Sequence, residues 1–372
     1  MGALPTDGHL PIPDPSCTRQ MGKPDMMYAN VHAEGRSNNS LFATDDTVHR
    51  HNPTYTPRLL RQKFLERGIE INTPDLNQGR SVAFELHVEG RELSTRSVPR
   101  YLLAMENPNI NKLNASSDYC HLFDLAFAWD VRLHHLPNVV PILIPHPMVW
   151  QDFPAPRERP VFSCLINANK AFKEVLENDL YVERLKTIRW YEENAPGHFE
   201  LYGLGWNKAT PAFTAAGRLA RLGSRLKTRL FGIPPFPSYR GELSDKGEAL
   251  RRTRFSWCYE NNRDISNYVT EKMLDSLVHG CVPVYWGADN VADLVPPDCF
   301  IDRRRFRNTA EVHQHLLTID DARYLRYQQA IRDFLSSPAA RRFSSEEVMQ
   351  TVVDRVCADL PQRGLLVPGA SR

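Results

Sequence analysis

The sequence predicts an α/β protein made of two doubly wound domains, and three observations support this. The chain has 372 residues, which suits two domains of roughly 150–200 residues each. Strand-length apolar segments recur in both halves, separated mainly by polar connections in the first half and by helical patterns in the second, which is typical of parallel sheets. The segment FPAPRERP at 153–160 separates the halves, because its prolines and charges exclude a helix or a central strand. We therefore divide the chain into a mobile leader (1–24), an N-terminal domain (25–153), a linker (154–160), a C-terminal domain (161–343) and a C-terminal helix and tail (344–372).

Apolar segments of strand length recur through the first half, with one helical pattern among them. The helix is expected at Leu59–Arg67, ended near Gly68. The strands are expected at Met26–Val31, Ile69–Asn72, Ser81–Val88, Pro99–Met105, Leu122–Trp129 and Val139–Ile144.

The second half repeats the alternation and ends in helices. Strands are expected at Arg159–Asn167, Phe199–Tyr202, Phe255–Tyr259 and Val282–Trp286. Helices are expected at Leu180–Glu193, Ser244–Arg252, Asn267–His279, Thr309–Thr318, Ala322–Leu335 and Ser345–Ala358. Two such domains joined by a hinge place a ligand cleft between the carboxyl ends of their sheets. The final helix could cross back to brace the first domain.

The composition limits the partners and the compartment. A formal net charge of +2 makes no case for a nucleic-acid partner. No stretch approaches the ~20 consecutive apolar residues that span a bilayer, and Met1–Pro24 lacks the pattern of a signal peptide. Seven scattered cysteines without a C-x-x-C pair are typical of buried, reduced thiols. We expect a cytoplasmic protein.

The segment 255–302 carries the strongest chemical pattern. A strand delivers Glu260 and Asn261 to its carboxyl end, and a helix is expected to begin near Ser266 or Asn267. Four polar residues then fall in its first turns: Tyr268, Thr270, Glu271 and Lys272. A helix N-terminus beside a lysine suits a diphosphate, and a nearby carboxylate can bind a ribose diol.

Along the same helix, the apolar side chains of Met273, Leu274, Leu277 and Val278 should face the sheet. Glu271, Lys272 and Asp275 are then left on the exposed side. On this pattern alone, a capped helix with a solvated charge pair is the alternative interpretation.

Three ordered motifs in this segment resemble the α1,3-fucosyltransferase family (glycosyltransferase family ten), which comprises GT-B enzymes of bacterial type. They are CYEN at Cys258–Asn261, YVTEK at Tyr268–Lys272 and VPVYWG at Val282–Gly287. The following CFIDRRRF, at Cys299–Phe306, is similar to the next strand and loop of that family. The resemblance covers about 161–343 and implies a GT-B fold.

The resemblance also implies a set of donor-binding residues. Asn261 and Glu271 would contact the nucleoside, chiefly its ribose, and Lys272 would neutralise the diphosphate. Tyr268 and Thr270 would shape the same pocket.

An upstream arginine fits the same family pattern. The family begins one helix with an arginine, and Arg184 in RLKTIRWY matches it. It would be a second phosphate clamp, with a surface helix arginine as the alternative.

Fainter motifs occur in the first half, within PRYLLAMENPNINKLNASSDYCHLFDLAFAWD. Glu106 matches the catalytic base of the family and Asp130 a later aspartate. The family glycine before the base is Met105 here, which leaves the local backbone geometry open. Glu106 also ends an apolar strand, where a cleft residue is expected, and a carboxylate can accept a proton from a sugar hydroxyl. The alternative is a loop carboxylate without a catalytic role.

No metal site is expected. The chain has no D-x-D triplet, which commonly holds the cation of metal-dependent glycosyltransferases. The pairs His49-x-His51 and His313-x-His315 have no third ligand nearby. Lys272, Arg184 and the helix dipole would neutralise the leaving diphosphate instead. We therefore expect no required cofactor, with divalent ions at most stimulatory.

Together these features predict an inverting glycosyltransferase that moves fucose from GDP-fucose to a glycan hydroxyl. Such a transfer would serve protein glycosylation or the synthesis of lipopolysaccharide or other glycans. One alternative is the same fold and mechanism with a different nucleotide sugar. Another is a non-catalytic nucleotide- or carbohydrate-binding descendant.

A basic amphipathic helix is expected at Thr214–Phe231, where leucines recur at helical spacing and each follows an arginine. No acidic residue occurs from Asn207 to Gly241. Such a helix suits the anionic inner face of a membrane, where each cation adds about 1 kcal/mol, and would help with a lipid-linked acceptor. A helix packed on its own domain, or a mobile acceptor loop, is the alternative, and Gly217 and Gly223 weaken the helix prediction.

Overall fold

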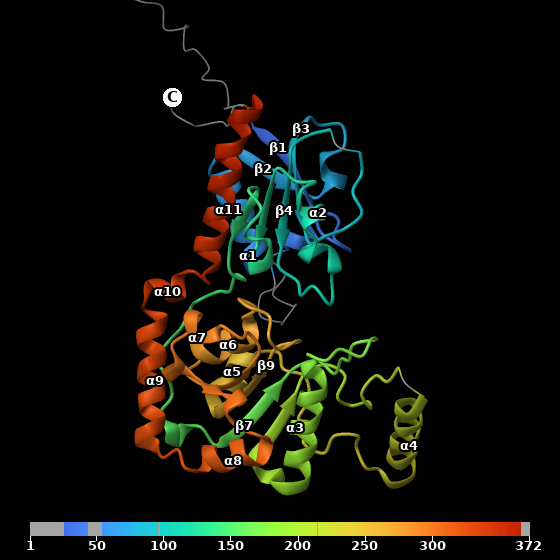
Figure 1. The fold of residues 1–372 in the computed structure, drawn as a ribbon, viewed down its shortest axis with the longest axis vertical. Helices are drawn as coiled ribbons and strands as arrows, with labels where there is room; N and C mark the ends of the chain where they lie inside the picture. Colours follow the sequence, from blue (N-terminus) through green and yellow to red (C-terminus); the bar gives the residue numbers. More distant parts are fainter. Residues whose placement is uncertain (1–25, 44–53, 96, 214, 366–372) are drawn as a thin grey trace, which may run out of the picture.

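Two parallel sheets, one above the other in Figure 1, form the two halves of the molecule. The computed structural model describes residues 26–43, 54–95, 97–213 and 215–365. The predicted leader (1–24), Thr214 and the pair His49 and His51 lie outside the described residues.

The first sheet has six parallel strands. They are β1 (Met27–His32), β2 (Ile69–Asn72), β3 (Val82–Val88), β4 (Arg100–Ala104), β5 (Leu125–Ala128) and β6 (Val139–Pro141). Their order is β2-β1-β3-β4-β5-β6, so the strand order reverses between β1 and β3. In doubly wound sheets, ligands bind at the carboxyl end of such a reversal.

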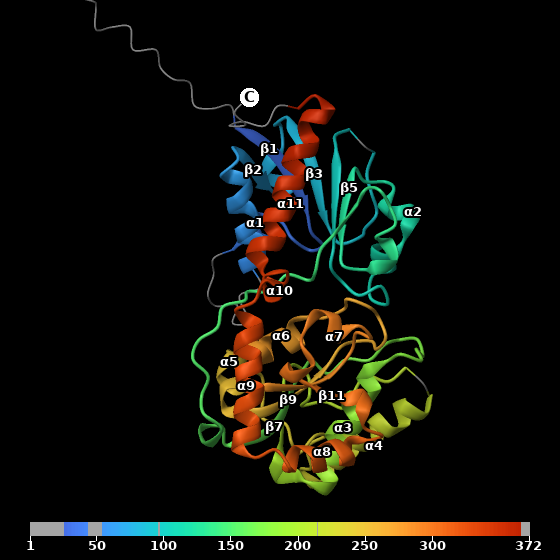
Figure 2. The ribbon, with the colours of Figure 1, turned by 60° about the vertical axis from the view of Figure 1, so that its left-hand side comes forward.

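Helices from both ends of the chain cover this first sheet. The helix α1 (Tyr55–Leu65) contributes Leu60 and Phe64 to the core, while α2 (Ser117–Cys120) is a single turn. The last helix, α11 (Ser345–Asp359), returns from the other half and packs with α1 on the same core through Val352 and Val356. Figure 2 shows α11 running along the first sheet.

The second sheet repeats the same winding with five strands. They are β7 (Val161–Ile166), β8 (Phe199–Tyr202), β9 (Thr253–Tyr259), β10 (Val282–Trp286) and β11 (Ile301–Asp302). The order β11-β10-β9-β7-β8 places the reversal between β7 and β9. All pairs are parallel, so the polar residues that follow β7 and β9 meet at one edge.

Helices flank the second sheet and connect it to the first. They are α3 (Leu180–Asn194), α4 (Ala215–Phe231), α5 (Lys246–Arg252), α6 (Glu271–Val278), α7 (Val291–Leu294), α8 (Thr309–Leu317), α9 (Asp321–Leu335) and α10 (Pro338–Arg341). None of the helices in the described ranges is long and apolar enough to cross a membrane.

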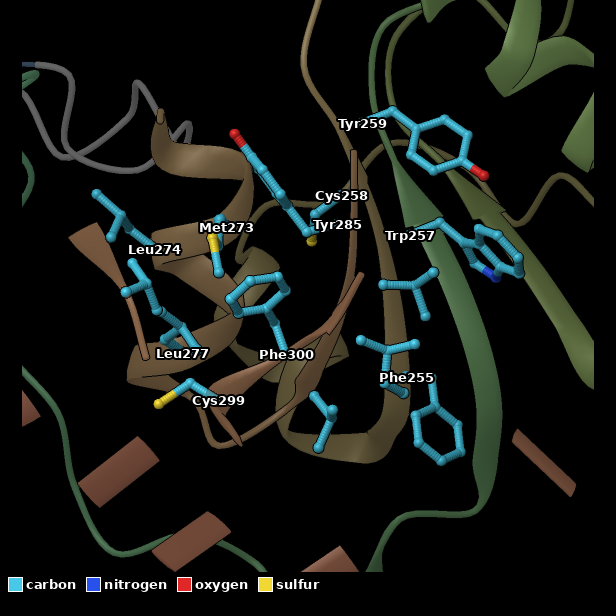
Figure 3. Packing of buried hydrophobic residues seen from close by; sticks show 14 of the residues in the cluster. Phe255, Trp257, Cys258, Tyr259, Met273, Leu274, Leu277, Tyr285, Cys299 and Phe300 are labelled. Carbon is cyan, nitrogen blue, oxygen red and sulfur yellow. The ribbon is translucent and has the colours of Figure 1, made fainter. Parts of the chain in front are cut away.

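The buried side chains of β9 alternate between two layers, as a strand covered on both faces requires. Trp257 lies edge to face with Tyr191 of α3, while Cys258 lies 3.2 Å from Ser276 of α6 through its sulfur. Figure 3 shows Met273 and Leu277 of α6 on the side of the sheet opposite to Trp257. This packing fixes α6 against β9 and β10.

Two expectations about α6 are wrong. The helix begins at Glu271, not near Asn267, with Thr270 as its N-cap residue. Asn267 has a left-handed backbone (φ 63°), whereas an N-cap residue is normally extended. Asp275 is buried rather than exposed, because His146 and Lys246 pack against its carboxylate at 3.4 and 3.2 Å.

The expected helix at Leu59–Arg67 begins four residues earlier, at Tyr55. Pro57 falls in its first turn, where backbone N–H groups have no partner within the helix, so the N–H that proline lacks is not needed there. The first strand is shifted by one residue, and the strand expected at Val139–Ile144 already ends at Pro141.

Candidate functional site

A cavity of about 450 Å³ lies between the two halves and collects every residue predicted to act in catalysis or donor binding. Those residues are Glu106, Arg184, Asn261, Tyr268, Thr270, Glu271 and Lys272. Ile166 ends β7, Asn167 follows it and Asn261 follows β9, so the cavity lies at the reversal of strand order in the second sheet. The fold alone therefore predicts a ligand at this position.

Lys272 is the most constrained cation of the cavity. Its Nζ atom lies 3.0 Å from Thr270 Oγ1, 3.2 Å from Glu271 Oε1 and 3.3 Å from Glu260 Oε2. Burial opposes its charge, but Glu271 and Glu260 outweigh burial and raise the pKa of Lys272 above its ordinary value. The ammonium group therefore stays protonated at neutral pH and is held at the N-terminus of α6, where an anion is favoured.

Glu260 fixes the turn that leads into α6. Its fully buried carboxylate accepts hydrogen bonds from the Thr270 amide (2.9 Å) and the Thr270 hydroxyl (2.8 Å). Burial raises the pKa of Glu260, although Lys272 opposes the shift. A side chain at Gly287 would come within 2.4 Å of the Glu260 Cγ atom, so a glycine is needed there to leave room for this carboxylate.

Tyr268 and Asn261 form the wall between the two halves. The phenol of Tyr268 is 2% exposed and accepts a hydrogen bond from Asn261 Nδ2 (3.3 Å). Its ring lies 4.9 Å from the ring of Trp129, which belongs to the first half. The Trp129 indole N–H in turn donates to the Met105 carbonyl (2.8 Å), beside Glu106. Contacts through Trp129 therefore join the two sides of the cavity.

Arg184 is a buried cation, not a surface helix arginine. Its Nη2 atom donates to the carbonyls of Tyr259 (2.6 Å) and Glu260 (2.7 Å), at the end of β9. The guanidinium lies 4.5 Å from the ring centre of Tyr181. Its buried Nε atom has no hydrogen-bond partner within the described protein, and the residue lines the cavity.

Glu106 reaches the cavity from the loop after β4. Its Oε1 atom accepts from the Asn107 amide at 2.7 Å. The amides of Met105 and Glu106 both donate to Glu89 Oε2, at 3.2 and 3.0 Å. Met105 does not adopt a left-handed backbone, so this loop needs no glycine where the family pattern has one. Asp130 does not line the cavity; it is buried and pairs with Arg132.

Four further charged residues line the cavity that the sequence patterns did not indicate: Glu89, Lys170, Glu242 and Lys246. Glu89 lies just after β3, and burial raises the pKa of its carboxyl group. Lys246 begins α5 and donates to Asp275 at 3.2 Å. Glu89 lies at the carboxyl end of a predicted strand, which was a usable signal, whereas only the tertiary packing brings Lys246 to the cavity.

Among the described residues, one group of three side chains could bind a metal ion, and none of the three lines the cavity. They are His32, Glu85 and His87, at the carboxyl ends of β1 and β3. Glu85 already pairs with Arg100 at 2.9 Å, and the two imidazole rings are stacked with an angle of 6° between their planes. A metal must lie near the plane of each imidazole that binds it, so parallel stacked rings do not suit a shared ion. His313 of the predicted histidine pair is buried in the second half.

Part of the second half is similar to proteins of a known family. Residues 221–364 match the family model of the C-terminal part of glycosyltransferase family 10 (fucosyltransferase). An alpha-(1,4)-fucosyltransferase of Arabidopsis thaliana is 30% identical over 118 residues, which are 31% of this chain and 29% of that protein. The alpha-(1,3)-fucosyltransferase FucT of Helicobacter pylori is 33% identical over 94 residues, which are 25% of this chain and 18% of that protein.

A solved structure shares the whole fold. An alpha-glucosyltransferase in complex with UDP-glucose and DNA containing an abasic site has a TM-score of 0.53 and 13% identity, covering 89% of this chain and 99% of that chain. The predicted GT-B fold is thereby confirmed. The matched segments span less than a third of either curated relative, and Glu106 and Arg184 precede the segment that matches the family model.

Proposed function

We propose that the chain is a family 10 glycosyltransferase that transfers fucose from GDP-fucose to a glycan hydroxyl with inversion, and the match of residues 221–364 to the family model supports this. The observation that carries the proposal is the cavity between the domains. One carboxylate, Glu106, enters it from the first half, and two fixed cations, Arg184 and Lys272, enter from the second.

The proposed reaction is a single displacement. The acceptor oxygen forms a bond to the anomeric carbon while the bond from that carbon to the diphosphate oxygen breaks. The acceptor proton moves to Glu106, and the negative charge that develops on GDP is stabilised by Lys272 and Arg184. Attack opposite the leaving group inverts the anomeric centre.

The remaining predicted residues support donor binding in this scheme. Asn261 and Glu271 flank the cations and offer hydrogen-bonding groups to a ribose. Tyr268 and Thr270 shape the wall and the turn that hold Lys272. The cations supply the charge that a metal would otherwise supply, so we propose that no cofactor is required and that divalent ions at most stimulate.

The first test is a screen of nucleotide sugars by slow hydrolysis, which needs no acceptor. We expect GDP-fucose to be hydrolysed faster than UDP- and dTDP-sugars. Faster release from a UDP- or dTDP-sugar would show that the same fold uses another donor. Absence of turnover with every donor and with glycan acceptors would favour the non-catalytic alternative.

Binding gives an independent test of the nucleotide. GDP and GDP-fucose should raise the melting temperature, while UDP and dTDP at equal concentration should do little, because only a ligand that binds the folded state stabilises it. Stronger stabilisation by UDP would overturn the donor assignment.

A further inference from the structure

An excursion of the chain leaves the cavity wall and returns to it. Gly203 and Leu204 line the cavity before the excursion, and Glu242 and Leu243 line it afterwards. The two ends are held together, because the Gly203 amide donates to the Gly241 carbonyl at 3.1 Å. The excursion 205–241 therefore starts and ends at a fixed point beside the proposed active site.

Aromatic packing makes the base of this excursion rigid. Trp206 is buried, and its indole N–H donates to the Asn167 carbonyl at 2.6 Å. Its ring lies edge to face against Phe236, with ring centres 4.9 Å apart. Arg189 of α3 covers the other aromatic ring, with its guanidinium carbon 4.2 Å from the Phe236 ring centre.

The tip of the excursion is α4, which stands apart from both sheets in Figure 1. Its leucines form one face of the helix and are turned to solvent: Leu219, Leu222, Leu226 and Leu230 are 70, 62, 55 and 63% exposed. Phe231 at the end of α4 and Ile233 beyond it extend the exposed apolar surface, and they are 70 and 51% exposed. A helix packed on its own domain is therefore not what this segment forms.

Cations lie beside this apolar face. Arg218, Arg221, Arg225 and Arg229 each precede one of the leucines by one position, so they follow one flank of the leucine row. The excursion contains no acidic residue to neutralise them. An isolated apolar patch does not identify its occupant, but an apolar row with a cationic flank is complementary to an anionic lipid surface.

We propose that α4 docks the protein on an anionic membrane surface, with the leucines at the acyl boundary and the arginines among the headgroups. A second copy of the chain fits less well, because pairing two α4 helices through their leucine faces would bring two uncompensated arginine rows together. If the function proposed above holds, the rigid base keeps the docked helix beside the cavity, so the acceptor class would be a lipid-linked glycan.

The test is sedimentation of the full chain with vesicles of phosphatidylglycerol and phosphatidylcholine. We expect binding to anionic vesicles, much weaker binding to pure phosphatidylcholine, and loss of binding at high salt. The variant R218Q/R221Q/R225Q/R229Q should bind at least about tenfold more weakly, since each cation near the surface is worth about a fivefold factor. A second variant, L219Q/L222Q/L226Q/L230Q, should also lose binding.

The matched control is R305Q/R326Q/R341Q/R355Q, which removes the same charge from four exposed arginines outside α4 and should bind like the wild type. Equal sedimentation of the wild type and the α4 arginine variant would overturn the proposal. A dimer in solution that the leucine variant dissociates would also overturn it, because a second copy would then cover the leucine face.

Slow hydrolysis of GDP-fucose separates this proposal from the proposed function. Both α4 variants should hydrolyse the donor like the wild type, because α4 contributes no residue to the cavity. Hydrolysis without vesicle binding would reject docking and leave the function standing. If the wild type binds vesicles but neither it nor any variant hydrolyses GDP-fucose, the proposed function is rejected and the docking proposal stands.

Discussion

The two halves share one winding but contribute unequally to the cavity. The second half supplies cations whose positions are fixed: Lys272 has three oxygen partners, and Arg184 is anchored to two carbonyls. The first half supplies one carboxylate for proton transfer, Glu106, on a loop whose backbone amide donates to Glu89. Nucleotide binding should therefore depend mainly on the second half, while the chemical step depends on both. Mutations on the two sides should separate these properties.

The largest effect is expected on the side of the first half. Glu106→Gln removes the proton acceptor but little volume, so transfer should fall by ~10²–10⁴-fold. The affinity for GDP should not change, because no predicted GDP contact is lost. Initial rates and calorimetric titration with GDP measure the two quantities. Glu34→Gln, on an exposed residue of the same half, is the control. Transfer at the wild-type rate would place the base elsewhere.

On the other side, Lys272→Ala should change both properties. The leaving diphosphate loses a charge partner, and loss of one such stabilising group typically costs ~10²–10³-fold in rate. GDP should also bind more weakly, because the same ammonium group faces the bound product. Lys173→Ala removes an exposed lysine of the same half and should leave both quantities unchanged. A Lys272 variant with slower transfer but unchanged GDP affinity would contradict the proposed division between the halves.

A smaller effect on transfer is expected from changing Glu89, which accepts hydrogen bonds from the loop that carries Glu106. Glu89→Ala leaves the amides of Met105 and Glu106 without their acceptor, so the loop should lose its fixed position and kcat should fall about tenfold. Glu89→Gln retains an acceptor oxygen and should recover much of this loss. GDP affinity should be unchanged in both variants. If Gln and Ala are equally impaired, the carboxylate acts by its charge rather than by holding the loop.

The sequence could predict what depends on local order. The β9–α6–β10 segment carries three spaced motifs, and the donor-binding residues predicted from it all line the cavity. The alternation of apolar segments likewise predicted both sheets, because a buried parallel strand is apolar along its length. The single leucine face of α4 also follows from its spacing in the sequence, whereas only the structure shows that this face is turned to solvent.

What the sequence could not predict depends on partners far along the chain. Asn267 has a left-handed backbone, and its amide is held by the Asn290 side chain (2.8 Å), so α6 starts later than its polar residues suggest. Asp275 is buried because His146 and Lys246 arrive from other elements. The potential metal ligands His32 and His87 are neighbours because of the register of β1 against β3, which their spacing in the sequence does not show.

The smallest effect should come from removing metal ions. The charge of the leaving diphosphate is to be met by Lys272 and Arg184, with Lys246 also lining the cavity, and the described residues there form no three-ligand metal group. Transfer should therefore continue in EDTA at a rate close to that in untreated buffer, with divalent ions adding only what faster product release allows. Adding Mg²⁺ to Lys272→Ala should not restore its rate, because no group of three ligating side chains among the described residues lines the cavity. Complete loss of transfer in EDTA, reversed by Mg²⁺ or Mn²⁺, would reject this mechanism, because a metal ion would then perform the charge stabilisation that we propose for Lys272 and Arg184.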